Sequence, residues 1–174
     1  MTSLKKQKER AKIMAVTLVR ELLPALFFVY LLFGVLLQIT VVSGESMEPS
    51  FSNGDILLTC RVFRDISRGD IVVCIPEKFG RPIIKRVVGI AGDQIEIDAD
   101  SGEIAVNGEK LREPYLSTEV PVQYQSLTVN VREGTVFLLG DNRNRSLDSR
   151  SQEIGLVSTE EIKSKYLFTL WGAR

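Results

Sequence analysis

Residues 41–51 read Val-Val-Ser-Gly-Glu-Ser-Met-Glu-Pro-Ser-Phe, and the chain changes character across this stretch. A long apolar run precedes it, and short apolar segments separated by turn residues follow it. Ser46 lies between Gly44 and Pro49, and a serine in such a turn is usually only a turn residue. Three features favour a nucleophile instead: the apolar run, a lysine in a later apolar segment, and a polar loop after Leu139.

The apolar run contains no charged residue from Leu22 to Gly44. A helix of about 23 residues at about 1.5 Å per residue covers about 34 Å, enough to cross the hydrocarbon core of a bilayer. The segment before it is basic, which predicts an N-terminus in the cytoplasm and the rest of the chain outside. The basic residues among the first twenty face only Glu9 and are Lys5, Lys6, Lys8, Arg10, Lys12 and Arg20.

Two other interpretations of the run stay open. One is a helix in the core of a soluble domain, which does not need so continuous an apolar stretch. The other is a cleavable signal peptide cut near residues 41–43, although the run exceeds the usual apolar length of about 7–15 residues. The favoured division is a cytoplasmic basic tail at 1–20, a transmembrane helix at 21–43 and an extracytoplasmic β-domain at 44–174. A small β extension is expected at about 93–130.

After Phe51, short β-branched or apolar segments alternate with turn signals, of which Asn107-Gly108 is a strong hairpin signal. Ser158–Lys163 carries a helix-start pattern but is short. The predicted fold class is therefore mainly β, an antiparallel sheet or partly open barrel on a single N-terminal transmembrane helix. The expected strands are 55–60, 70–75, 82–90, 94–98, 103–106, 128–131, 135–139 and 166–171.

Composition excludes several classes of function. The 174 residues carry a formal net charge of +0, so no nucleic-acid partner is predicted. The chain contains no histidine, which excludes Ser-His-Asp and Cys-His catalysis and histidine-ligated zinc. Cys60 and Cys74 lie in separate apolar segments, and both a pair of buried thiols and a disulfide stay open. No metal or cofactor is predicted.

Without histidine, a nucleophilic serine needs another base, and a lysine serves only in its neutral, desolvated form. Strand alternation places Lys85 on one face with Ile83 and Val87. Burial there would lower its pKa. The alternative is a surface lysine that lies across apolar neighbours with its head in water.

The loop from Gly140 to Arg150 (GDNRNRSLDSR) is rich in short polar side chains that bond to the backbone and to one another. A solvated turn is the plainer interpretation. A calcium loop is disfavoured, because arginines occupy positions where oxygen ligands would be needed. In the functional interpretation, Ser146 orients the lysine amine and an Asp148–Arg150 ion pair fixes the loop.

Taken together, these segments resemble the bacterial type I signal peptidases, the membrane-anchored Ser-Lys leader peptidases. The resemblance covers nearly the whole chain, and the motifs in this order are highly specific. Besides the anchor, they are Ser46-Met47-x-Pro49, Arg68-Gly69-Asp70-Ile71-Val72, Lys85-Arg86-Val87-Val88-Gly89 with Gly92-Asp93, and Gly140-Asp141-Asn142-Arg143 with Ser146-x-Asp148-Ser149-Arg150.

The resemblance implies Ser46 as nucleophile and Lys85 as general base, with Ser146, Asp148 and Arg150 in support. The Ser46 backbone N–H would stabilise the oxyanion. Some family members place a second donor, a serine hydroxyl, where this chain has Gly44. Ser43 is one residue further back, so the second donor stays open between these two residues.

The resemblance also implies a substrate and a location. Signal peptides of secretory preproteins would add as an extended strand and be cut after small residues, typically Ala-x-Ala. The expected location is the bacterial plasma membrane, single-pass, in contact with lipid, with the N-terminus cytoplasmic and the catalytic domain outside. The expected substrate pocket is lined by Val42, Met47, Phe51, Ile83 and Ile84.

Three alternatives stay open. The first is a self-cleaving repressor-type Ser-Lys protease, which would carry a DNA-binding module in place of the apolar run. The second is a dedicated maturation peptidase or assembly factor for pilus-type or conjugation substrates, which can share every motif. The third is an anchored β-domain that only binds, in which the loss of Ser46 or Lys85 would be expected.

Overall fold

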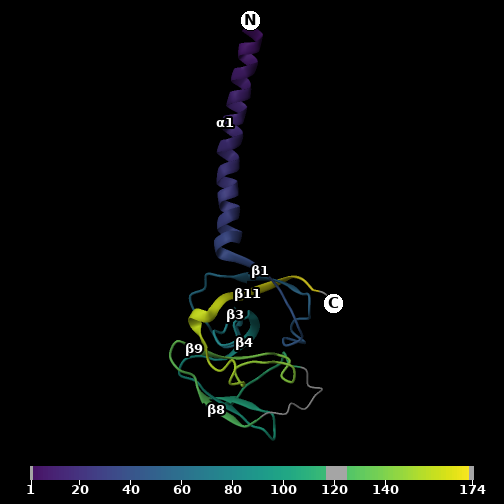
Figure 1. Ribbon diagram of the computed structural model, residues 1–174, viewed down its shortest axis with the longest axis vertical. Helices are drawn as coiled ribbons and strands as arrows, with labels where there is room; N and C mark the ends of the chain where they lie inside the picture. Colours follow the sequence, from purple (N-terminus) through teal and green to yellow (C-terminus); the bar gives the residue numbers. More distant parts are fainter. Residues whose placement is uncertain (1, 117–124, 173–174) are drawn as a thin grey trace. The chain divides into compact units, whose positions relative to one another are not determined.

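The computed structural model describes residues 2–116 and 125–172, and the chain divides into two units at Leu37. The first unit is helical. Helix α1 (Thr2–Tyr30) continues into a π-helical segment, Leu31–Leu36 (Figure 1). The stretch Lys12–Leu36, 25 residues with a mean hydropathy of 1.9, is long and apolar enough to cross a membrane.

The helix ends earlier than the apolar run. A transmembrane helix was expected over 21–43, but Leu37–Val41 forms strand β1 instead. The chain leaves helical geometry at Leu37, which has φ −112° and ψ 152°. Ile39, Thr40 and Val41 are β-branched, and such residues favour strands over helices. A continuous apolar run therefore holds two kinds of secondary structure.

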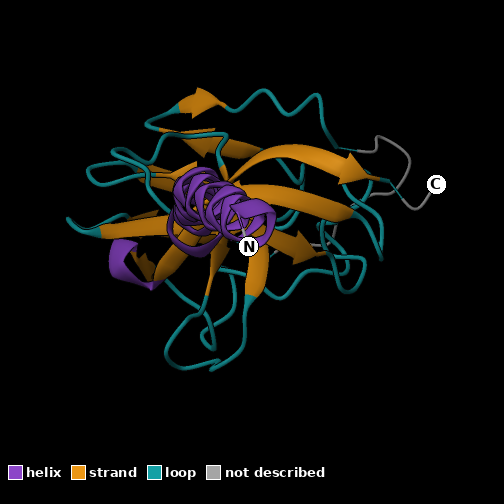
Figure 2. Ribbon diagram, turned by 90° about the horizontal axis from the view of Figure 1, so that it is seen from above, coloured by secondary structure: helices purple, strands orange, loops and turns teal. Residues whose placement is uncertain are grey.

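The second unit is mainly β, as Figure 2 shows by colour, and the predicted fold class is confirmed. Its larger sheet has the strand order β1-β2-β11-β3-β4-β9-β10, and the strands from β2 to β10 in this order pair antiparallel. The strands after β1 are β2 (Ile56–Cys60), β3 (Ile71–Cys74), β4 (Ile83–Gly89), β9 (Thr135–Leu139), β10 (Val157–Ser158) and β11 (Ile162–Trp171).

Strand β11 is longer than the expected 166–171, and it joins two parts of the sheet. Its first half pairs with β3, where Ser164 faces Val73, and its second half pairs with β2, where Thr169 faces Leu57. A short 3-10 helix, Thr159–Glu161, precedes it and is closed by a capping box. The helix-start pattern noted at Ser158–Lys163 in the sequence corresponds to this short 3-10 helix.

A smaller sheet has the order β7-β6-β5-β8, with strands β5 (Gln94–Ile97), β6 (Ile104–Val106), β7 (Glu109–Lys110) and β8 (Leu127–Asn130). The predicted hairpin at Asn107-Gly108 is confirmed, because both residues have positive φ and join β6 to β7. The apolar face of the small sheet packs on the larger sheet. At this contact Ile95 lies so close to Gly89 that a Cβ added to Gly89 would lie 2.7 Å from Ile95 Cδ1.

Candidate active site

Ser46 lies in the turn that joins β1 to β2. Gly44 has φ +92°, in the left-handed region that favours glycine, and its N–H donates to Asn53 Oδ1 at 2.9 Å. Met47 is buried, and its carbonyl accepts the Phe51 N–H at 2.9 Å. The backbone is thus fixed on both sides of Ser46, which holds its side chain in place.

Lys85 lies on β4, opposite Val72 of β3. Only 3% of Lys85 is exposed, so its head is not in water. Its Nζ lies 2.8 Å from Ser46 Oγ and donates to the Ile84 carbonyl at 3.0 Å. Val87, on the same face by strand alternation, is buried as well. The structure therefore brings the two principal candidates within hydrogen-bond distance.

The surroundings of Lys85 decide its charge. Burial lowers the pKa of Lys85 from 10.5, because the ammonium loses its hydration. Asp148, Cys74 and Asp141 oppose this effect and Arg150 adds to it, and the net direction is downward. A larger fraction of neutral amine follows, which is the form that accepts a proton.

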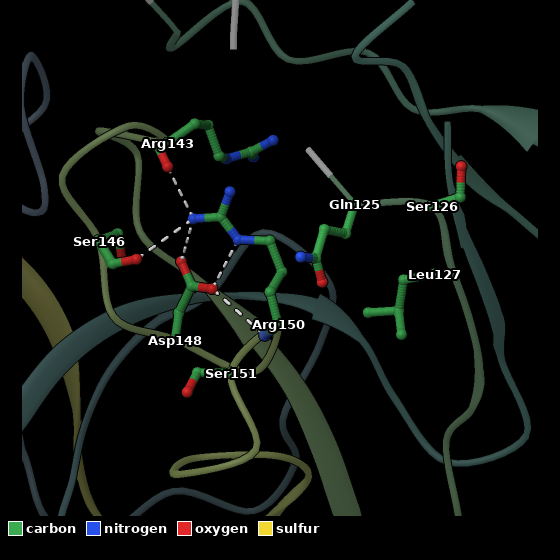
Figure 3. Close-up of a pocket in the computed structure, with 8 residues that line it drawn as sticks. All are labelled: Gln125, Ser126, Leu127, Arg143, Ser146, Asp148, Arg150 and Ser151. Atoms are coloured by element: carbon green, nitrogen blue, oxygen red, sulfur yellow. Dashed lines mark hydrogen bonds and ion pairs between the residues drawn. The ribbon is translucent and has the colours of Figure 1, made fainter. Parts of the chain in front are cut away.

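Residues 140–150, here called the site loop, follow β9. Asp148 pairs with Arg150 at 2.8 Å, and Asp148 Oδ2 accepts the Gly140 N–H at 3.0 Å. Arg150 Nη2 also donates to the Arg143 carbonyl at 2.8 Å (Figure 3). A cavity of about 280 Å³ lies beside this ion pair. The expected pairing of Asp148 with Arg150 is present in the structure and closes the loop on itself.

Ser146 does not hydrogen-bond Lys85. Its Oγ is buried and has no partner among the described residues, while its carbonyl accepts from Arg150 at 3.4 Å. A Cβ added to Gly140 would meet Ser146 Oγ at 2.1 Å and the Ser46 carbonyl at 2.5 Å. The Ser146 hydroxyl therefore lies in the narrow space between the site loop and the turn that carries the candidate nucleophile.

A second set of contacts ties the site loop to the rest of the site. The Asn142 N–H donates to the Ser46 carbonyl at 3.0 Å. Arg86, next to the candidate base, donates to both carboxylate oxygens of Asp141 at 2.8 and 2.6 Å. Asp141 also accepts the Ser50 hydroxyl at 2.5 Å. The sequence motifs contain Arg86 and Asp141, but sequence reasoning assigned neither a role.

A cavity of about 180 Å³ opens beside Ser46 and Lys85. Of the predicted pocket residues, Phe51 alone does not line this cavity. Phe51 is buried and packs against Tyr166, with the ring centroids 4.9 Å apart. Sequence reasoning missed part of the wall: Thr40, Val41, Ser43 and Pro82 lie within two residues of predicted ones, but Val73 comes from a different strand. The remaining lining residues are Thr40, Val41, Val42, Ser43, Met47, Val73, Pro82, Ile83 and Ile84.

The candidate oxyanion donors differ in their availability. The Ser46 N–H has no acceptor within residues 2–116 and 125–172. The Gly44 N–H is already bonded to Asn53. Ser43 is exposed and lines the cavity, so its hydroxyl is open to a ligand there. Of the two candidates for the second donor, only Ser43 has a group that is not already used.

A fixed serine hydroxyl beside a buried amine, on a curled antiparallel sheet, is the arrangement of a serine endopeptidase. The family model described as "Signal peptidase, peptidase S26" matches residues 15–171. Signal peptidase I of Bacillus licheniformis is 32% identical over 163 residues, which cover 86% of each chain. Signal peptidase I of Bacillus amyloliquefaciens is 35% identical over 141 residues, 74% of each chain.

A solved structure agrees with these relatives. The crystal structure of a signal peptidase I from Enterococcus faecalis aligns with a TM-score of 0.51 and 28% identity, covering 62% of this chain and 100% of that one. The chain therefore belongs to the signal peptidase family, peptidase S26. Family membership supports the coarse function, removal of signal peptides by a serine protease.

Proposed function

We propose that this protein is a membrane-anchored serine endopeptidase that removes signal peptides from exported preproteins after small residues such as Ala-x-Ala. Ser46 is the nucleophile and Lys85 is the general base. The observation that carries the proposal is the 2.8 Å separation of Lys85 Nζ and Ser46 Oγ, with the lysine 3% exposed. No histidine is present to take the role of Lys85.

The reaction follows from this pair. Neutral Lys85 Nζ takes the proton of Ser46 Oγ as the oxygen bonds to the scissile carbonyl carbon. The resulting ammonium donates that proton to the leaving amine nitrogen as the C–N bond breaks, which leaves an acyl-serine. Lys85 then takes a proton from a water molecule that attacks the acyl carbon. Its return to Ser46 Oγ releases the carboxyl product and restores both residues.

The Ser46 N–H is the first oxyanion donor, and we assign the Ser43 hydroxyl as the second. Fixed donors of this kind stabilise charge that develops on the carbonyl oxygen. Asp148 and Arg150 hold the site loop, and we assign the buried Ser146 hydroxyl, which has no partner among the described residues, the role of orienting the lysine amine. These three residues position the base rather than touch the substrate.

The substrate site is the cavity between residues 40–43 and 82–84. β1 is at one edge of the larger sheet, and an extended peptide can add to such an edge by backbone hydrogen bonds. The volume of about 180 Å³ and the apolar wall of Val42, Met47 and Ile84 suit small uncharged side chains. This supports cleavage after alanine-like residues.

Two features support anchoring to a membrane. The stretch Lys12–Leu36 has the length and hydropathy of a span. In the second unit, β11 leaves large apolar side chains exposed, including Trp171 at 60% and Phe168 at 52%. Tryptophan is favoured at the boundary between lipid and water. The basic residues before the span support an orientation with the N-terminus in the cytoplasm and the peptidase outside.

The test is cleavage of a membrane-inserted preprotein with an Ala-x-Ala site by the full chain in detergent. Native protein should cut after the second alanine, and Ser46→Ala and Lys85→Ala should each lose at least about a thousandfold in kcat. Ser101→Ala and Lys110→Ala, exposed residues of the small-sheet region, are the matched controls and should keep native rates. Native rates in Ser46→Ala or Lys85→Ala would refute the mechanism.

A further inference from the structure

The segment after β7 contacts the site loop through an ion pair. Arg143 Nη1 donates to Glu113 Oε2 at 3.0 Å, and Arg143 Nη2 donates to Oε1. The Arg143 side chain is 2% exposed and that of Glu113 is 11% exposed. A bidentate arginine–carboxylate pair has a fixed geometry, and few waters compete with it here. Glu113 therefore fixes the position of Arg143 closely.

Tyr115, two residues later, joins this pair to the strand of the candidate base. Its hydroxyl donates to Glu113 Oε1 at 2.8 Å. Its ring lies against the Arg86 guanidinium, whose Cζ is 3.9 Å from the ring centroid. Burial raises the pKa of Tyr115, and the Glu113 carboxylate raises it further, so the phenol stays protonated and keeps donating.

Both arginines hydrogen-bond other residues of the site loop, to which Arg143 itself belongs. Arg86 binds Asp141 through two hydrogen bonds. Arg143 Nε donates to the Gly140 carbonyl at 3.0 Å, and the Arg143 carbonyl accepts from Arg150. The segment that holds Glu113 and Tyr115 thus makes two contacts. It bonds the site loop, which in turn bonds the Ser46 carbonyl, and it packs against Arg86, the residue beside Lys85.

We propose that Glu113 and Tyr115 are positioning residues for peptide cleavage, which hold the site loop and Arg86 in the geometry that the Ser46–Lys85 pair requires. The inference rests on the proposed function, because it assumes chemistry at that pair. The segment after β7 would then have a role in the active site as well as being the connection that follows the small sheet's strand β7.

The effect should appear in kcat rather than in KM. Neither residue lines the cavity beside Ser46, so binding of the peptide is not directly altered. A loosened site loop misplaces the reacting groups, and a misplacement of about 1 Å can cost about a hundredfold in rate. It also admits water to Lys85, whose titratable neighbours are Asp148, Cys74, Asp141 and Arg150.

The experiment measures kcat and KM for a quenched fluorescent Ala-x-Ala peptide with the full chain in detergent. Glu113→Gln removes the ion pair, and Tyr115→Leu removes the ring from Arg86 without breaking an ion pair. We expect kcat to fall about ten- to a hundredfold in each, with KM within about twofold. The acid limb of the pH–rate profile should move to higher pH, because a hydrated Lys85 titrates nearer its ordinary pKa.

Glu103→Gln is the matched control, because it removes the carboxylate of the exposed Glu103–Lys110 pair in the same small sheet. It should leave kcat, KM and the pH profile unchanged. Thermal unfolding of every variant gives the folded fraction at the assay temperature. A loss of rate that only follows the folded fraction, or native kcat in both Glu113→Gln and Tyr115→Leu, would overturn the inference.

Ser46→Ala in the same assay separates the two hypotheses. If the native protein cleaves, Ser46→Ala is inactive and both positioning variants keep native kcat, only the further inference fails. If Ser46→Ala cleaves at the native rate, the proposed function itself fails.

Discussion

Lys85 Nζ lies 2.8 Å from Ser46 Oγ, although the two residues are 39 positions apart in the chain. Ser46 comes from the turn between β1 and β2, and Lys85 comes from β4. The two residues belong to different hairpins, so they come together only when the sheet has formed. The burial that makes the lysine a usable base is a property of the assembled sheet.

The pH dependence of cleavage tests the protonation state of Lys85. Its pKa lies below 10.5 because of burial, and the proposed mechanism uses the neutral form. We therefore expect kcat/KM to rise with pH through a limb whose midpoint is below 10.5. Lys85→Arg, which stays protonated, should be inactive across the same range. A native rate independent of pH between about 5 and 10 would contradict the assignment of a lysine base.

Lys85 should cost stability. Its folded-state pKa is lowered, so at pH values below 10.5 the unfolded chain binds a proton more readily than the folded one, and stability falls as pH falls. Lys85→Met should therefore be inactive yet more stable by about 1–2 kcal/mol near neutral pH. The gain should shrink as pH rises toward 10.5. Thermal unfolding of the full chain in detergent, from about pH 6 to 9, measures this difference.

The matched control for that prediction is Lys110→Met. The Lys110 side chain is 67% exposed, so its removal should give no gain that depends on pH. Equal gains in the two variants would show that the effect comes from added apolar surface rather than from the buried amine.

Gly140 should be intolerant of any side chain. A Cβ would lie 2.5 Å from the backbone carbonyl of Ser46, which cannot move without displacing the nucleophile. Gly140→Ala should lower kcat by at least about a hundredfold. Gly172→Ala is the control, since its Cβ would meet only Asp55 Oδ1, at an ordinary 3.8 Å. Near-native kinetics in Gly140→Ala would mean that the site loop does not need this close approach.

Ser146→Ala should affect stability and rate in opposite directions. Its Oγ is buried without a partner among the described residues, and such a group costs about 1–3 kcal/mol. Removing the hydroxyl should raise the unfolding temperature, while kcat falls about tenfold if Ser146 orients the lysine amine during turnover.

Ser164→Ala provides the comparison for Ser146→Ala. Ser164 Oγ is also buried and unpartnered within the described part of the chain, but it lies on β11, opposite Val73. This variant should gain stability and keep its kcat. A native kcat in Ser146→Ala would leave Ser146 with a packing role alone.

Much of this arrangement was predictable from local pattern. Alternation along residues 83–87 put Lys85 on an inward face, and the absence of histidine made an amine base the natural partner for Ser46. The Asp148–Arg150 ion pair was expected from the functional interpretation of the polar loop, and the structure contains it. Turn residues such as Asn107-Gly108 located three strands of the small sheet to within a residue or two, but the short strand β7 was not among the expected strands.

Other parts depend on contacts between distant segments. Nothing in the sequence near Glu113 or Tyr115 indicates that they reach Arg143 and Arg86. The strand at Leu37–Val41 was not predicted, because a continuous apolar run is compatible with both a membrane helix and a buried strand. Phe51 was assigned to the pocket wall from its place in the motif, but packing directs its ring toward Tyr166 instead.

The position of β11 in the larger sheet has a consequence for when Ser46 and Lys85 can come together. In the sheet, β11 separates β2, which follows Ser46, from β3 and β4, which carry Lys85. Its residues, Ile162–Trp171, come after those of every other strand that the structure describes. During synthesis the candidate nucleophile and base are therefore made well before the strand that lies between their two parts of the sheet. We therefore expect a nascent chain that has not yet reached Trp171 to lack a correctly placed Ser46–Lys85 pair, even though both residues have already been made.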